Sequence, residues 1–148
     1  MARSGDGIPQ PGSVIRYSYL WADERARGRE EGIKDRPSLV LALSVRDKGR
    51  TTEIMVVAMT HTPPGRPADG VPVPNDIKRR LGLDEAPTWI VTTEANVFVW
   101  PGPDLRPIPT RRPATAIYGR VPERFLSKIA HSYLANRTRQ RRLVIRTA

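Results

Sequence analysis

Two adjacent segments of the chain have the hydrophobic pattern of paired β-strands. Residues 38–46 and 53–59 are rich in valine, isoleucine and leucine, residue types that favour strands. The segment between them, Asp47-Lys-Gly-Arg50, is polar and contains a glycine. The pattern therefore predicts a β-hairpin, with Pro37 at the first strand position, where its missing N–H does little harm.

Shorter apolar segments predict further strands at residues 14–20, 88–94 and 96–100, with Tyr17 and Tyr19 on one face of the first. A short helix over 75–81 is expected to end at Gly82, since glycine readily takes the left-handed conformation found at helix ends. A longer helix is expected to begin at residues 121–123. Its apolar residues recur at helical spacing: Phe125, Leu126, Ile129, Ala130, Tyr133 and Leu134.

The remaining segments are rich in proline, glycine or charge. Residues 62–74 and 101–113 are proline-rich connections, and residues 22–36 read as a mobile, charged surface loop. Residues 1–11 are expected to be a loose arm and residues 12–136 a single domain. Residues 137–148 contain five arginines. They are expected to form either a basic tail that binds nucleic acid or a solvated extension of the last helix. Short strands with one terminal helix predict a mainly β fold with some α (α+β), arranged as a small barrel-like sheet.

The amino-acid composition indicates which classes of partner the chain suits and excludes some kinds of catalytic and metal-binding site. The chain has 148 residues and a net charge of +10, which favours a nucleic acid or an acidic protein as partner. The absence of cysteine and the presence of two histidines exclude thiolate catalysis, disulfides and histidine-rich metal sites, so no metal or cofactor is expected. No apolar run approaches the ~20 residues of a membrane span, and the first residues lack the apolar segment of a signal peptide. We therefore expect a cytosolic protein.

The predicted hairpin carries the candidate chemistry. Arg36 stands just before its first strand, and the second strand leads into Thr60-His61-Thr62. An arginine is a planar donor for phosphate oxygens, so a guanidinium beside hydroxyls predicts a cleft that handles a phosphodiester. The alternatives are an ion pair of Arg36 with Asp35 or a loop glutamate, a turn role for Thr60, and an ordinary surface position for His61 rather than general acid–base work.

The order of these features resembles the MazF/PemK family of type II toxin–antitoxin endoribonucleases (Kid-like toxins). The similarity covers roughly residues 12–62 and 115–134. The matching segments are Gly12-Ser-Val-Ile, Gly28-Arg-Glu-Glu-Gly, Arg36-Pro-Ser-Leu-Val-Leu, Val57-Ala-Met-Thr60 and Ile117-Tyr-Gly-Arg-Val121. The loop before Arg36 is at least one residue longer than is usual, and residues 19–24 and 100–106 have no counterpart in typical members. The resemblance is therefore to a divergent branch.

This resemblance implies an SH3-like β-barrel, a homodimer and metal-independent cleavage of single-stranded RNA. In that reaction the ribose 2′-hydroxyl attacks the adjacent phosphorus and leaves a cyclic phosphate and a 5′-hydroxyl. Arg36 matches the catalytic arginine, Thr60 its hydroxyl partner, and Glu31 the loop glutamate. The implied protein partner is an antitoxin, whose acidic segment would occupy the basic RNA groove.

Further residues are candidate RNA contacts. Trp21 is expected to stack on an unpaired base, and Lys34, Thr62 and Arg66 to contact RNA. Glu24 is also counted among the candidate RNA contacts; like Glu31, it is either a proton-transfer group or part of a solvated face. Two rival functions remain: a gyrase poison of the same fold, which needs no active site, and a non-catalytic nucleic-acid-binding barrel, for which the basic tail matters more than the cleft.

Overall fold

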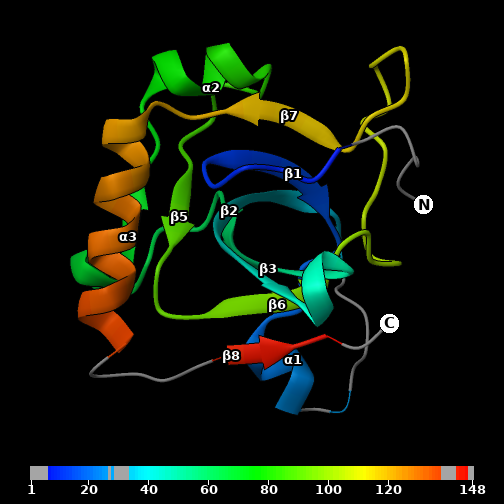
Figure 1. Ribbon diagram of the computed structural model, residues 1–148. Helices are drawn as coiled ribbons and strands as arrows, with labels where there is room; N and C mark the ends of the chain where they lie inside the picture. Colours follow the sequence, from blue (N-terminus) through cyan, green and yellow to red (C-terminus); the bar gives the residue numbers. More distant parts are fainter. Residues whose placement is uncertain (1–6, 27, 29–33, 138–142, 147–148) are drawn as a thin grey trace.

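The computed structural model describes residues 7–26, 28, 34–137 and 143–146. Its described part is a mainly antiparallel sheet with a few helices (Figure 1), so the α+β class is confirmed. No helix there is both long enough and apolar enough to cross a membrane. In chain order the elements are β1 (Ser13–Tyr17), α1 (Ala22–Ala26), β2 (Arg36–Arg46), η1 (Asp47–Gly49), β3 (Thr51–Thr60), η2 (Pro67–Asp69), β4 (Gly70–Pro72), α2 (Asn75–Leu81), β5 (Trp89–Val91), β6 (Ala95–Val99), β7 (Ile117–Arg120), α3 (Glu123–Arg137) and β8 (Leu143–Ile145).

The sheet is organised around β3. The strand order is β4-β5-β3-β2-β1-β7, and β6 pairs with the first half of β3 while β5 pairs with its end. Among the described strands, these pairings form an open path rather than a closed ring. Figure 1 shows the sheet curling so that β1, β2 and β3 wrap round a common interior. A register shift between Val40 and Ala42 accompanies this bend in β2, as bulges commonly do.

Both faces of the central strands are buried at Ser38–Val40 of β2 and Val56–Met59 of β3, which explains the continuous apolar sequence there. Along β3, Ile54, Val56 and Ala58 belong to the cluster inside the curl. The alternate residues Val57 and Met59 belong to a second cluster, which includes residues of α2 and α3. The hairpin predicted from these two apolar segments is confirmed, with η1 as its turn.

Both predicted helices are also confirmed. Helix α2 ends at Gly82, whose φ is +73°, a conformation that glycine adopts without steric cost. Helix α3 buries Phe125, Ile129 and Tyr133. Leu134, predicted to lie in the same apolar stripe, is instead 56% exposed.

Several predicted boundaries were wrong. The first strand ends at Tyr17, and the strands predicted at 88–94 and 96–100 are Trp89–Val91 and Ala95–Val99. Residues 22–26 of the predicted loop form α1, because Glu24 Oε1 accepts a hydrogen bond from the Trp21 N–H and caps the helix start. The proline-rich segment 62–74 contains η2 and β4, since β4 finds a partner in β5.

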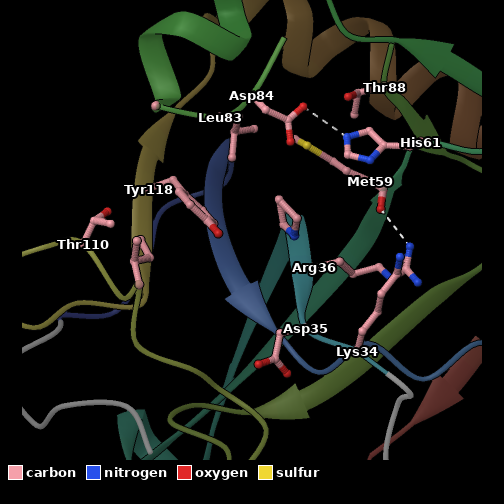
Figure 2. Close-up of a pocket in the computed structure, with 13 residues that line it drawn as sticks. Lys34, Asp35, Arg36, Met59, His61, Leu83, Asp84, Thr88, Thr110 and Tyr118 are labelled. Carbon is pink, nitrogen blue, oxygen red and sulfur yellow. Dashed lines mark hydrogen bonds and ion pairs between the residues drawn. The ribbon is translucent and has the colours of Figure 1, made fainter. Parts of the chain in front are cut away.

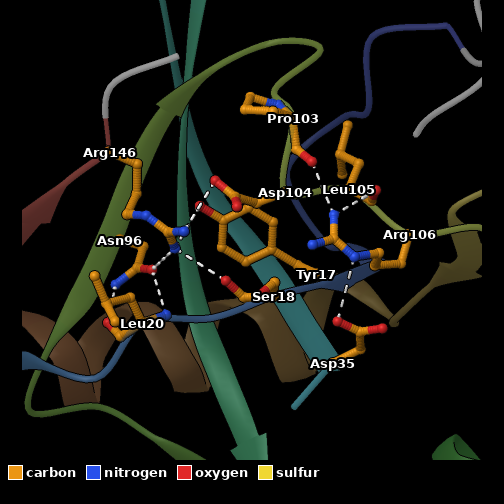
Figure 3. A network of polar contacts seen from close by, with 10 residues as sticks. All are labelled: Tyr17, Ser18, Leu20, Asp35, Asn96, Pro103, Asp104, Leu105, Arg106 and Arg146. Carbon is orange, nitrogen blue, oxygen red and sulfur yellow. Dashed lines mark hydrogen bonds and ion pairs between the residues drawn. The ribbon is translucent and has the colours of Figure 1, made fainter. Parts of the chain in front are cut away.

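Part of the predicted basic tail belongs to the sheet. Residues 143–145 form β8, which pairs with β6 in parallel, and the Arg146 side chain is buried (Figure 3). Its guanidinium lies 2.9 Å from Asp104 Oδ2 and donates to Ser18 O and Asn96 Oδ1. Residues 143–146 are therefore neither a free tail nor a solvated extension of α3, because the Asp104 carboxylate and the oxygens of Ser18 and Asn96 bind the Arg146 side chain.

Candidate functional site

The register of the hairpin brings the two central candidate residues together. Ser38 pairs with Ala58 and Leu39 with Val57, so the same antiparallel register continued by two residues sets Arg36 opposite Thr60. Residues opposite each other in such a pair project from the same face. Arg36, the first residue of β2, and Thr60, the last residue of β3, line the same cleft.

Arg36 is half-buried and is held from two sides. Its Nη1 donates to the carbonyl oxygen of Met59 at 3.4 Å, and its guanidinium carbon lies 5.1 Å from the centre of the Trp21 ring, in cation–π range. Its Nε is buried and has no hydrogen-bond partner among the described residues. Burial lowers the pKa of Arg36, while the nearby Glu24 and Tyr19 raise it. A buried donor without a partner costs free energy, and an acceptor such as a phosphate oxygen would satisfy it.

A cleft of about 540 Å³ opens at this arginine. It brings together most of the sequence-predicted residues: Trp21, Lys34, Arg36, Thr60, His61 and Thr62. Thr60 Oγ1 also accepts a hydrogen bond from the Thr62 N–H at 3.1 Å. The turn role considered for Thr60 is therefore present, and the hydroxyl lines the cleft as well.

His61 has a carboxylate partner that the sequence did not predict. Its Nε2 lies 3.3 Å from Asp84 Oδ1, with the two side chains 56% and 67% exposed. Asp84 comes from the loop after α2, and Figure 2 shows it beside the imidazole ring. An exposed pair of this kind contributes little to stability, but a carboxylate fixes the orientation of an imidazole.

Two of the described candidate residues are not brought into this cleft, and a third candidate cannot be placed. Glu24 is 5% exposed and caps α1 rather than lining the cleft. Arg66 pairs with Asp69, a cleft residue, at 3.7 Å, but does not itself line the cavity. Glu31 lies outside the described residues.

The surroundings of Arg36 and Trp21 hold these two side chains in place. Asp35, considered above as an ion-pair partner for Arg36, lies instead 3.6 Å from Arg16. It also lies 3.5 Å from Arg106, as Figure 3 shows. Among the described residues, no carboxylate forms an ion pair with Arg36. On the other side, Glu94 Oε2 accepts hydrogen bonds from the Tyr19 hydroxyl and the Ala22 N–H. This buried glutamate fixes the start of α1, and with it Trp21.

A second hollow, of about 400 Å³, also opens at Arg36 (Figure 2). Lys34, Arg36 and His61 line both cavities. The residues specific to the second hollow include Leu83, Asp84, Thr110 and Tyr118. Tyr118 lies within the segment that resembles the closing part of the MazF/PemK family, but Asp84 and Thr110 carry no motif, so sequence reasoning missed them.

No protein-family model and no curated protein sequence matches the chain. The function must therefore be argued from the site itself. In the part of the chain that the structure describes, no group of three or more histidine, aspartate or glutamate residues could hold a metal ion. Besides the carboxylates of Asp23 and Asp69, the cleft offers a positively charged, partly buried donor group, a hydroxyl, an imidazole and an aromatic ring. Together they suit a phosphodiester with an adjacent unpaired base.

Proposed function

We propose that this protein is a toxin of the MazF/PemK type, an SH3-like barrel that cleaves single-stranded RNA without a metal ion. A curled sheet of short antiparallel strands, with α3 packed against β2 and β4, supports the fold part of this proposal. The proposed location is the cytoplasm.

One observation carries the proposal. Arg36 is half-buried between Trp21 and the Met59 carbonyl, its Nε lacks a partner among the described residues, and Thr60 lines the same cleft. A guanidinium held in this way is preorganised for added negative charge, and such preorganised donors are worth most where water is partly excluded. A structural arginine would be expected to have a carboxylate partner.

The proposed reaction needs no protein nucleophile. The 2′-hydroxyl oxygen forms a bond to the adjacent phosphorus, the bond from phosphorus to the 5′-oxygen breaks, and a 2′,3′-cyclic phosphate and a 5′-hydroxyl result. One proton leaves the 2′-hydroxyl and one is delivered to the 5′-oxygen. We assign charge stabilisation to Arg36 and Thr60, and one proton transfer to His61. Glu31 remains the candidate for the other.

The proposal also includes the partners. The net charge of +10 suits both RNA and the acidic segment of an antitoxin, which would inhibit by occupying the same cleft. A homodimer is expected because small sheets commonly bury an edge against a twofold mate.

Incubation of the purified protein with single-stranded RNA and a chelator tests this function. We expect cleavage, with 5′-hydroxyl and 2′,3′-cyclic phosphate ends identified by mass spectrometry. Cleavage only after addition of a divalent metal would contradict the mechanism. Binding of RNA without any cleavage would favour the non-catalytic binding function instead.

A further inference from the structure

Two cavities meet at the proposed catalytic arginine, and each contains one aromatic side chain. Lys34, Arg36 and His61 form their common wall. Trp21 lines the first cavity and Tyr118 the second. In Figure 2, Tyr118 and Thr110 lie on one side of the second hollow, and Lys34, Arg36 and His61 lie on the other.

The charges differ between the common wall and the interior of the second hollow. Lys34 and Arg36 are the permanent cations among the residues that line the second hollow, and both belong to the wall. The two carboxylates of the lining already have partners, since Asp35 lies near Arg16 and Arg106 and Asp84 lies near His61. The favourable position for a phosphate is therefore the wall.

The rest of the second hollow suits a nucleobase. Leu83 and Ile108 provide apolar surface, and Thr110 provides a hydroxyl. Tyr118 is half-buried, and its ring has the Arg111 guanidinium 5.8 Å from its centre, so the ring is supported from outside the hollow. An aromatic ring with a few hydrogen-bonding groups is the usual composition of a site for an unpaired base.

We propose that the second hollow binds the base on one side of the phosphate contacted by Arg36, while Trp21 binds the base on the other side. A dinucleotide step thus spans the two cavities, with its phosphate at the common wall. This inference takes its substrate class from the proposed function, but it does not depend on cleavage. It also gives a reason for single-strand selection, because neighbouring bases separated by a wall cannot remain stacked as they are in a duplex.

The test uses dinucleoside monophosphates of the 2′-deoxy series, which have one phosphate and lack the attacking hydroxyl. Dissociation constants are measured by NMR titration for all dinucleotide sequences. The tightest binder is then compared with its two abasic versions, one lacking the 5′ base and one lacking the 3′ base. Loss of one aromatic contact should weaken binding of the intact dinucleotide by about 5- to 150-fold.

The decisive result is a crossed pattern in double-mutant cycles. Trp21→Ala should weaken binding only when one of the two bases is present, and Tyr118→Ala only when the other is present. Tyr118→Phe, which keeps the ring, is the matched control and should retain the coupling. Thr110→Trp fills the second hollow from an exposed position and should remove the contribution of the same base as Tyr118→Ala does. It provides the test if Tyr118→Ala does not fold.

Three results would overturn the inference: coupling of both aromatic residues to the same base, no coupling of Tyr118→Ala or Thr110→Trp to either base, or no binding of any dinucleotide. A crossed pattern in a protein that never cleaves RNA would instead contradict the proposed function and leave the two-cavity inference standing. The two hypotheses therefore fail in different ways.

Discussion

Replacement of Arg146 by alanine should strongly destabilise the fold, although this residue lies in a segment whose composition suggests a solvated tail. Arg146 is 6% exposed. Its guanidinium forms an ion pair with Asp104 at 2.9 Å and hydrogen bonds to Ser18 O at 2.9 Å and Asn96 Oδ1 at 3.1 Å. The variant removes all of these contacts at once and takes the guanidinium away from a buried carboxylate.

The expected loss follows from that buried carboxylate. Breaking a buried ion pair by removing one partner costs about 3–5 kcal/mol of the free energy of unfolding. For a chain of this size such a loss lowers the melting temperature by roughly 6–20 °C. Arg50→Ala is the matched control, because Arg50 is exposed next to the hairpin turn, and surface substitutions of that kind stay within about 0.5 kcal/mol.

Urea unfolding followed by tryptophan fluorescence measures the difference. The double variant Arg146→Met/Asp104→Leu should recover much of the loss, since an apolar pair of similar volume avoids burying a charge without its partner. A stability of Arg146→Ala equal to that of Arg50→Ala would refute this account of the C-terminal segment.

Three further predictions concern the fold and its assembly. Gly82→Ala should lower the free energy of unfolding by about 1–2 kcal/mol, because φ is +73° at this helix end; an unchanged urea midpoint would contradict this. Burial, and then the neighbouring Glu94, raise the pKa of Tyr19 well above 10.0, so the folded state keeps a proton that the unfolded state loses. Stability should therefore fall as the pH rises above about 10, and less steeply in Tyr19→Phe; equal slopes in urea titrations of the two proteins would exclude Tyr19 as the cause. Sedimentation equilibrium should give a dimer, and a mass near that of one 16.6 kDa chain at micromolar concentrations would overturn that expectation.

The parts of the fold that could be predicted are those in which local pattern and tertiary packing agree. The hairpin of β2 and β3 has branched apolar residues on both faces and a polar turn at Gly49, and α2 has a glycine where its C-terminus needs positive φ. Strands β4 and β8 could not be predicted, because each is three residues long and depends on a distant partner strand. The burial of Arg146 likewise depends on Asp104, which lies in a proline-rich connection.

In the candidate site, too, the residues that could be predicted are those that the local sequence pattern brings together. Arg36 and Thr60 were predictable together because the hairpin register links them. Glu24 was misjudged because composition shows a charged loop, whereas the structure has its carboxylate at the start of α1. Asp84 and Tyr118 reach the second hollow from elements far apart in the sequence, and no spacing in the chain predicts such a meeting.

The central claim is tested most directly by the single-turnover rate of RNA cleavage by Arg36→Ala, measured beside its affinity for a non-cleavable 2′-deoxy oligonucleotide of the same sequence. We expect a rate about 100- to 1000-fold below that of the wild type, by analogy with removal of one oxyanion donor, with a much smaller loss of affinity and no change in Arg50→Ala. Equal losses of rate and affinity would reduce Arg36 to a phosphate anchor. An unchanged rate would remove it from the active site and contradict the account.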